Sequence, residues 1–306
     1  MIAPTAAPTA APAAAPTATS SAKQTLQGAH PVGARPPRGH VTRGKTAANR
    51  LRRIDVWTAL YDPWLLRRED GPWSNAWVVD LGYGASAATT LETAARLRRL
   101  NPALRVMGVE IDRARVDAAQ PFADAQTVFR HGGFALPLAS AGGRTETVRL
   151  VRAMNVLRQY EEAEVEAAHA ALIGQLLPGG LLIEGTSDPT GRHWVVNVLR
   201  RPVDGAPSHA PGREALIFGT NFADGFDPDR FKAVLPKDLI HRVVPGEPIH
   251  AFFEDWRAAW RDASPDSVWG PRFQFRHAAM GLGRRGHAIT LRRAMLDRGL
   301  LVWRPA

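Results

Sequence analysis

The sequence predicts an α/β fold in which helices cover both faces of a mostly parallel sheet. Short apolar runs recur between residues 76 and 184, and such runs are typical of buried parallel strands. Segments whose apolar residues recur every three or four positions alternate with these runs, as expected for helices that pack on a sheet. Two of the runs end in acidic residues, and a loop with two glycines follows the first of them.

The chain begins with a segment that lacks the composition of a folded domain. Residues 1–22 are almost entirely Ala, Pro, Thr and Ser, and residues 23–53 add eight Lys or Arg and no acid. Such a segment cannot bury enough apolar surface to offset the entropy of ordering. We therefore expect a disordered tail over residues 1–50, basic in its second half. One folded domain is expected over residues 51–306, with residues 188–270 as an insertion that could cover a substrate.

Each element of the folded domain follows from the residue pattern. Apolar residues from Ile54 to Leu65 recur at helical spacing, which predicts the first helix. The expected strands are residues 76–81, 106–112, 127–129, 147–152, 181–184, 193–199, 215–218 and 300–303. The further helices are expected at residues 90–100, from 113, and at 164–177, 251–262 and 277–297. Thr89 and Glu92 have the spacing of a helix-capping box, and residues 178–180 predict a turn into the fifth strand.

The candidate site lies at the carboxyl ends of the first two strands, where an open parallel sheet leaves a crevice for a ligand. Gly82 and Gly84 let the backbone turn sharply and come close to that ligand. Asp80 can accept a hydrogen bond from a cationic amine, and Glu110 can accept both hydroxyls of a ribose. Together these groups fit a nucleoside that carries an amino acid.

These residues resemble the class I S-adenosylmethionine-dependent methyltransferase family. Residues 78–84 look like the first motif of that family, residues 109–112 like its acidic second strand, and residues 177–183 like its turn into strand five. The resemblance implies a Rossmann-like sheet of seven strands, with S-adenosylmethionine at the glycine loop and Glu110 on its ribose. The cofactor-binding residues expected on this basis are Asp80, Gly82, Tyr83, Gly84, Glu110, Ile111, Phe134, Met154 and Asn155.

The chain departs from the family pattern in ways that keep two alternatives open. Ser86 stands where the family usually has a third glycine, and 30 residues separate Asp80 from Glu110, more than is usual in the family. Phe134 follows the third strand where the family often has an acid, and is expected to pack against adenine. The first alternative is a nicotinamide-dependent Rossmann enzyme, since Glu110 also suits the ribose of NAD. The second is a non-catalytic nucleic-acid-binding protein on a degenerate methyltransferase fold.

The sequence predicts no particular catalytic residue. The methyl group of a sulfonium is already activated, so the protein mainly has to position the acceptor. Side chains that could act as a base or hold the substrate are Tyr160, Glu184, Asp188, His193 and Asn221. The absence of cysteine excludes thiolate metal sites and a cysteine nucleophile, and the ten histidines are scattered, so no metal site is expected. Residues 154–157 lack the Asp/Asn-Pro-Pro-aromatic motif of enzymes that methylate exocyclic amines.

Two acceptor classes remain. RNA is slightly favoured, because the basic N-terminal arm and the arginine-rich C-terminus (Arg284, Arg285, Arg292 and Arg293) could hold phosphates. A small-molecule acceptor would instead lie beneath residues 188–270, whose aromatic side chains could line an apolar pocket. No apolar stretch reaches the roughly 18 residues of a membrane span, and no charged segment precedes an apolar run at the N-terminus. We therefore expect a cytoplasmic protein.

Overall fold

The computed structural model describes residues 39–41, 47–203 and 213–305. These ranges belong to one compact unit that begins at Pro37. The disorder predicted for residues 1–38 concerns residues outside the described ranges. Arg50, directly before the predicted start of the folded domain at residue 51, donates hydrogen bonds to the carbonyl oxygens of Ser187 and Asp188, both at 3.1 Å.

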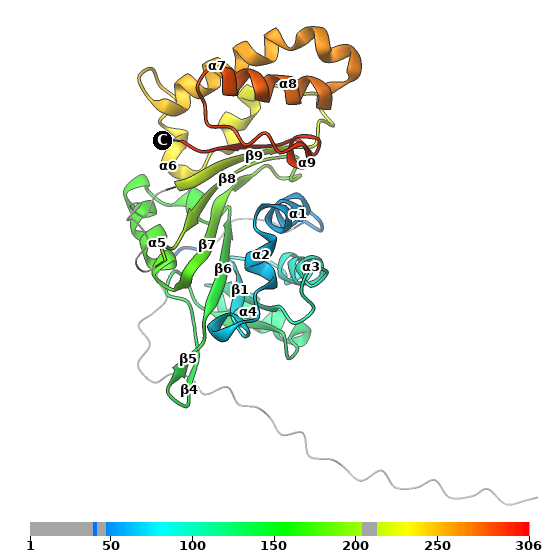
Figure 1. The fold of residues 1–306 in the computed structure, drawn as a ribbon. Helices are drawn as coiled ribbons and strands as arrows, with labels where there is room; N and C mark the ends of the chain where they lie inside the picture. Colours follow the sequence, from blue (N-terminus) through cyan, green and yellow to red (C-terminus); the bar gives the residue numbers. More distant parts are fainter. Residues whose placement is uncertain (1–38, 42–46, 204–212, 306) are drawn as a thin grey trace, which may run out of the picture. The chain divides into compact units, whose positions relative to one another are not determined.

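An eight-stranded sheet forms the centre of this unit (Figure 1). Its order is β10-β9-β8-β7-β6-β1-β2-β3. The parallel strands are β1 (Trp77–Leu81), β2 (Arg105–Glu110), β3 (Thr127–His131), β6 (Val148–Met154) and β7 (Leu176–Ser187). The antiparallel strands that follow are β8 (His193–Arg200), β9 (Arg213–Thr220) and β10 (Leu300–Trp303). A separate short hairpin consists of β4 (Ser140–Ala141) and β5 (Arg144–Thr145).

This sheet order confirms the predicted Rossmann-like α/β class. Strand order reverses between β1 and β6, which creates the switch point where such sheets bind ligands. The predicted number of seven strands is wrong, because β8, β9 and β10 extend the sheet in a simple antiparallel series. All eight strands were nevertheless visible as apolar runs in the sequence. Apart from the edge strand β3, which is half-buried, these strands are buried on both faces over most of their length, so they lack the alternation of a half-exposed sheet.

Helices cover both faces of the sheet (Figure 1). One face carries α1 (Arg52–Tyr61), α2 (Pro63–Arg67), α3 (Ala88–Leu97) and α4 (Arg113–Ala119). The opposite face carries α5 (Glu162–Gly174) over β6 and β7. On that face β8–β10 are covered by the 3-10 helix η4 (Pro228–Val234), α7 (Pro248–Asp262) and α8 (Pro271–Arg284). The short helices α6 (Lys237–Ile240) and α9 (Arg293–Leu296) complete this part of the chain.

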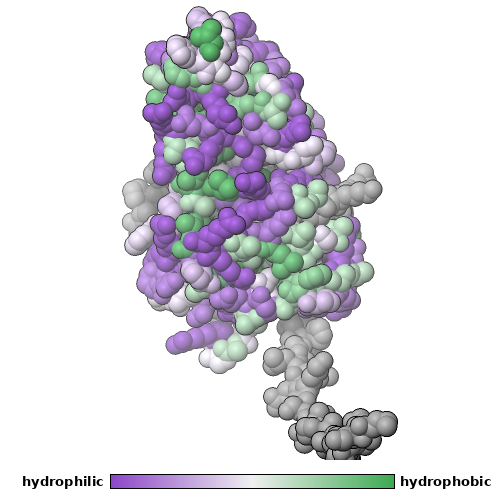
Figure 2. Space-filling model, turned by 90° about the vertical axis from the view of Figure 1, so that its right-hand side faces the viewer, coloured by the Kyte–Doolittle hydropathy of each residue, from purple (hydrophilic) through white to green (hydrophobic). Residues whose placement is uncertain are grey.

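The outer surface of the first helical layer is mixed in character. On the side that carries α1 to α4, hydrophobic residues form small groups among hydrophilic ones (Figure 2). Each helix turns its apolar side to the sheet, as Ile54 and Trp57 of α1 do, both fully buried. The apolar residues of this layer therefore serve mainly the core beneath it.

Several predicted boundaries need correction. The expected helix 277–297 is two helices, since α8 ends at Arg284 and Gly286 takes a left-handed conformation (φ 91°) that stops it. The expected turn at residues 178–180 lies inside β7, where the register with β6 is irregular. The expected capping box is absent, because α3 begins at Ala88. Residues 188–270 are not an insertion, since β8 and β9 lie within the sheet.

Candidate functional site

Two cavities open at the carboxyl ends of the parallel strands, as the sequence predicted for a ligand site. The small cavity, of about 20 Å³, lies among the ends of β1, β2 and β3 and the segment after β6. The large cavity, of about 650 Å³, lies among the ends of β1, β6 and β7 and is bordered by η4. Gly82 lines both cavities, so the glycine loop separates them.

The glycine loop has the geometry that its sequence implies. Gly82 (φ 67°) and Gly84 (φ 87°) both take left-handed conformations, which glycine adopts without strain. The amide of Gly82 donates to the carbonyl oxygen of Val109 at 2.7 Å, which ties the loop to β2. Between the glycines, Tyr83 is buried, and its ring meets Phe129 edge-on at 5.5 Å. Burial raises the pKa of the Tyr83 hydroxyl, and the nearby Glu110 carboxylate raises it further.

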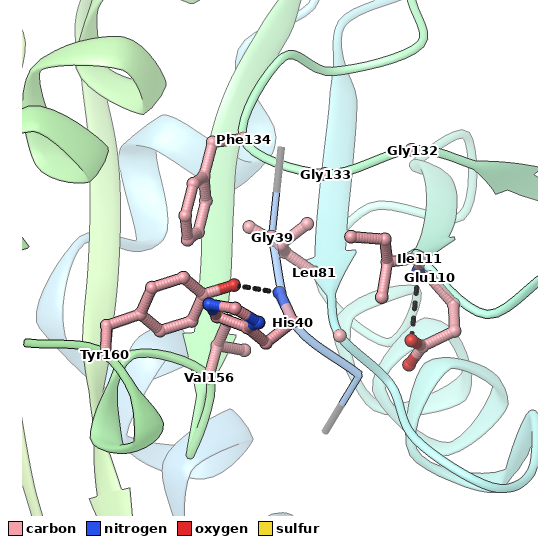
Figure 3. Close-up of a pocket in the computed structure, with 11 residues that line it drawn as sticks. Gly39, His40, Leu81, Glu110, Ile111, Gly132, Gly133, Phe134, Val156 and Tyr160 are labelled. Atoms are coloured by element: carbon pink, nitrogen blue, oxygen red, sulfur yellow. Dashed lines mark hydrogen bonds between the residues drawn. The ribbon is translucent and has the colours of Figure 1, made fainter. Parts of the chain in front are cut away.

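Glu110, the expected ribose acceptor, is committed to the protein backbone. One oxygen accepts from the amide of Gly84 at 2.9 Å, and the other accepts from the amides of Ile111 and Asp112 at 2.9 and 3.3 Å. Figure 3 shows the bond to Ile111. The Arg115 guanidinium lies 3.8 Å from the oxygen that accepts from Gly84, and the Glu110 side chain has no solvent exposure. Because the carboxylate is fully buried, a ribose could reach it only after a neighbouring segment moved away.

Asp80, the expected amine acceptor, is similarly occupied. Its carboxylate accepts from the hydroxyls of Thr89 and Thr90, at 3.1 and 2.8 Å, and from the Arg152 guanidinium, at 2.8 Å. These bonds explain why the expected capping box does not form, since Thr89 and Thr90 turn toward the sheet from within α3. Asp80 still lines the large cavity. Its oxygens are used mainly to hold α3 against β1.

Arg152 extends this arrangement into a buried charge cluster, consisting of Asp55, Asp80, Arg96 and Arg152. Arg152 also pairs with Asp55 at 2.5 Å, and Arg96 pairs with Asp55 at 2.7 Å. Burial raises the pKa of Asp55, although Arg152 and Arg96 counteract it. Burial acts to lower the pKa of Arg152, but the two carboxylates outweigh it and the pKa is raised. Arg152 is therefore a structural cation that links α1, β1 and β6.

Met154 and Asn155 both line the large cavity, at the end of β6. Asn155 has a left-handed backbone (φ 60°), which asparagine tolerates better than most residues. Its backbone amide donates to the carbonyl oxygen of Gly185 at 2.7 Å, and its side-chain oxygen accepts from the backbone amide of Ser187 at 2.9 Å. The expected cofactor residue Asn155 thus fixes the end of β6 to the end of β7.

Ile111, an expected cofactor residue, and Phe134, expected beside adenine, line the small cavity together with Tyr160. The segment Gly39–Val41 passes between Ile111 and the rings of Phe134 and Tyr160 (Figure 3). The His40 amide donates to the Tyr160 hydroxyl at 2.5 Å, and the His40 ring lies 5.0 Å from the Tyr160 ring. This contact could not be predicted from the sequence, because the segment is polar and lies far from any apolar run.

The five candidate clamp or base residues do not converge on one point. Asp188 lines the large cavity and Tyr160 the small one, whereas the other three line neither. Glu184 is buried beside His169, at 3.4 Å, and Asn221 accepts from the amide of Ala223 at 3.0 Å. His193 is buried with its Nδ1 atom 3.3 Å from Asp188.

Asp188 mainly organises the turn between β7 and β8. It accepts hydrogen bonds from the amides of Thr190, Arg192 and His193, at 2.9, 3.0 and 2.9 Å. Burial acts to raise its pKa, but these hydrogen bonds outweigh burial and hold the pKa below its usual value. Asp188 is therefore a carboxylate at neutral pH and a poor candidate for a proton-accepting group.

Two arginines on the wall of the large cavity were missed as site residues. Arg50 was assigned to the tail, and Arg158 was not singled out. Arg50 donates to two backbone carbonyl oxygens, as described above, and Arg158 donates to that of Ala233 at 3.1 Å. These neutral carbonyl groups orient both guanidinium groups, and the Asp188 carboxylate, on the same wall, offsets part of the charge of Arg50. The position of Arg50 directly before the first predicted helix was the sequence feature that could have placed it in the folded domain.

Within the described ranges, no group of three or more His, Asp or Glu side chains could hold a metal ion. The helices of the same ranges include none long and apolar enough to cross a membrane. The comparison with known proteins gives no match to a family model and none to a curated protein.

Solved structures do match. The magnesium protoporphyrin IX methyltransferase ChlM of Synechocystis PCC 6803 is 20% identical over 46% of this chain and 55% of that chain, with a TM-score of 0.32. The N-methyltransferase NodS of Bradyrhizobium japonicum WM9 is 18% identical over 45% and 70%, with a TM-score of 0.29. A structure described as a Plasmodium falciparum protein-L-isoaspartate O-methyltransferase is 14% identical over 54% and 72%, with a TM-score of 0.32. The chain thus spans about half the length of the first of these proteins. The fold assignment therefore rests on the strand order of this chain.

Proposed function

We propose that this protein is an S-adenosylmethionine-dependent methyltransferase whose acceptor enters the large cavity. One observation carries the proposal: the Gly82–Gly84 loop separates a small aromatic cavity beside Glu110 from a large cavity of mixed lining at the ends of β6 and β7. A nucleoside that carries an amino acid suits this division. Its base would lie between Ile111 and Phe134, its ribose at Glu110, and its amino-acid portion past the glycine loop.

The polar groups of the site suit this cofactor, although residues 39 and 40 fill most of the small cavity beside Glu110. A carboxylate at the end of β2 and a glycine loop at the end of β1 are the groups that a ribose and a close-lying chain require. The bound cofactor supplies a methyl group already activated by its sulfonium. The residues of the large cavity would then orient the acceptor and exclude water from it. Met154 and Asn155, fixed against β7, would form the wall nearest to the transferred group.

For the acceptor we propose a molecule with an anionic group, held by Arg50 and Arg158. RNA and a small anionic molecule both satisfy this description. The volume of about 650 Å³ lies within the usual range for small-molecule sites, which supports the smaller acceptor. RNA held by the C-terminal arginines has weaker support, because Arg285 pairs with Asp255 and Asp262, and Arg293 with Asp297.

A second candidate is a non-catalytic protein on the same fold. One observation favours it. The carboxylates of Glu110 and Asp80, the two acids expected to hold the cofactor, both accept hydrogen bonds from other groups of the protein. On this hypothesis the glycine loop is retained for packing alone, and the arginine-lined cavity binds its partner without methyl transfer.

Calorimetric titration with S-adenosylmethionine and, in parallel, NADH distinguishes these candidates. We expect saturable binding of S-adenosylmethionine. Shortening the carboxylate by Glu110→Asp should weaken that binding about 30-fold, the equivalent of about 2 kcal/mol for charge-assisted hydrogen bonds. The matched control is Asp117→Asn, an exposed acid on α4, which should leave binding unchanged. Binding of NADH alone would favour a nicotinamide enzyme, and no binding of either at millimolar concentration would favour the non-catalytic candidate.

A further inference from the structure

The small cavity is occupied by part of the chain itself. Residues Gly39–Val41, here called the strap, pass between Ile111 on one side and Phe134 and Tyr160 on the other (Figure 3). A Cβ atom on Gly39 would lie 2.9 Å from the Ile111 side chain and 3.0 Å from the Tyr160 hydroxyl. The strap thus fits the gap so closely that any larger residue at position 39 would require the Ile111 side chain to shift, at a backbone conformation that favours glycine.

The space that remains is too small for a nucleoside. With the strap present, the small cavity measures about 20 Å³, which is room for about one water molecule. Ligand pockets usually measure about 300–1,000 Å³. The strap and a nucleoside therefore cannot occupy this place together.

Glu110 is unavailable in the same state. Its two oxygens accept hydrogen bonds from the backbone at Gly84, Ile111 and Asp112. Both the base site and the ribose site are thus satisfied internally, one by the strap and the other by the glycine loop. The described structure is a closed form of the site.

Among the described residues, the strap makes two hydrogen bonds, both through the backbone of His40. The backbone amide of His40 donates to the Tyr160 hydroxyl, and its carbonyl oxygen accepts from the Gln159 side chain at 3.0 Å. The His40 ring packs against the Tyr160 ring. His40 and Val41 are exposed, and Val41 retains 48% exposure. A segment with so little burial opens far more readily than the core.

We propose that the strap is an autoinhibitory occupant of the nucleoside site, which the cofactor must displace. The inference rests on the proposed function, because it takes the small cavity as the place of the cofactor base. The aromatic wall of Phe134 and Tyr160 serves both occupants: it packs against His40 in the closed form and against the base in the open form. The observed affinity for cofactor is then reduced by the stability of the closed form.

One experiment follows the strap directly. Because the chain contains no cysteine, Val41→Cys introduces a single thiol that can carry a nitroxide spin label. S-adenosylhomocysteine, which carries the same nucleoside, should narrow the electron paramagnetic resonance spectrum as the strap is released. A label at Val268→Cys, a position with 80% exposure on the 3-10 helix Ser264–Trp269, is the control and should not respond. A label at residue 41 that becomes less mobile would overturn the proposal, since the strap would then close over the cofactor.

A second experiment measures the competition. Gly39→Val adds side-chain atoms where a Cβ already collides, and it does so at a backbone conformation (φ 151°) that favours glycine. The variant should release the strap and bind S-adenosylhomocysteine at least about fivefold more tightly than the wild type, the ratio expected from losing about one hydrogen bond of restraint. Because the strap lies at the surface, the melting temperature should change little, and this is measured alongside.

The outcomes separate the two proposals. Equal or weaker binding by Gly39→Val, with a wild type that does bind, refutes the autoinhibitory strap and leaves the methyltransferase proposal intact. Binding by the variant but not by the wild type supports both proposals. No binding by either protein at millimolar concentration refutes the methyltransferase proposal, and the strap inference falls with it.

Discussion

Both halves of the sheet pack against their helices through apolar side chains, but each half adds an interaction that the other lacks. In the first half, β1 and β6 meet α1 and α3 through the charge cluster, where Arg152 contacts both Asp55 and Asp80. In the second half, β8–β10 meet η4, α7 and α8 through aromatic rings. There Phe218 lies 5.1–5.4 Å, between ring centroids, from the rings of Phe231, Phe252 and Trp256.

The difference bears on where the function lies. Both cavities draw most of their walls from the first half, and Asp80 belongs both to the charge cluster and to the wall of the large cavity. Buried charges hold their positions through directional bonds, which can keep a wall in place beside an open space. Aromatic packing gains most when no space is left. The second half is thus the densely packed one, and the first half supplies most of the walls of both cavities.

The largest effect is expected from breaking the charge cluster. Arg152→Ala leaves Asp55 and Asp80 buried without their main cation, which should lower the free energy of unfolding at pH 7 by about 3–5 kcal/mol. The loss should shrink in acid, because a carboxyl group that is neutral no longer requires the cation. Urea denaturation at pH 7 and pH 5 measures both effects.

The control for this prediction is Arg99→Ala, an exposed arginine just after α3. Removal of an arginine at the surface should change the free energy of unfolding by less than about 0.5 kcal/mol. A loss below about 1 kcal/mol for Arg152→Ala would mean that water or rearranged side chains compensate for the missing cation, and the charge cluster would not be what holds the first half together.

The aromatic half should respond less strongly and without dependence on pH. Phe218→Leu keeps an apolar side chain but loses the ring contacts, so it should lower the free energy of unfolding by about 1–2 kcal/mol. The value should be equal at pH 7 and pH 5, since no titrating group is involved. A clear pH dependence would show that the two halves do not differ in the way described.

The sequence revealed the parts of this molecule that depend on local pattern. Every strand of the sheet was visible as an apolar run, and Gly82 and Gly84 marked the loop between the cavities. What it could not reveal are pairings across long distances. Asp80 was expected to face a ligand because it ends a strand, but its partner Arg152 lies 72 residues away along the chain. The contact between His40 and Tyr160 spans 120 residues.

A smaller, pH-dependent effect is expected at β7, which borders both halves. Burial raises the pKa of Glu184 above its ordinary 4.5, although His169 counteracts this. A carboxyl group with a raised folded-state pKa binds its proton more tightly in the folded protein, so its stabilising contribution is present at low pH and is lost as pH rises past 4.5. Glu184→Gln should remove this dependence, which amounts to at most about 1.4 kcal/mol per pH unit.

Denaturation of the wild type and Glu184→Gln from pH 4 to pH 8 measures the difference. The difference in the free energy of unfolding between the two proteins should grow in favour of the variant as pH rises. Glu166→Gln, an exposed acid on α5, should show no such trend. A difference that stays constant with pH would mean that Glu184 has the same pKa in the folded and unfolded chain.

The smallest effect is expected at the arginines of the large cavity, and it tests whether the first half binds an anion at all. If RNA phosphates contact Arg50 and Arg158, replacing both with Gln should reduce the slope of log affinity against log salt by about 2, one for each lost contact. Fluorescence anisotropy with a labelled single-stranded RNA at several salt concentrations gives this slope. The matched control is the pair Arg284→Gln and Arg285→Gln on and just after α8, in the second half. A change of slope in that pair alone would place RNA on the aromatic half and separate it from the cavities. No RNA binding by any of the proteins would leave the two cavity arginines to a small anionic acceptor, for which a volume of about 650 Å³ is sufficient.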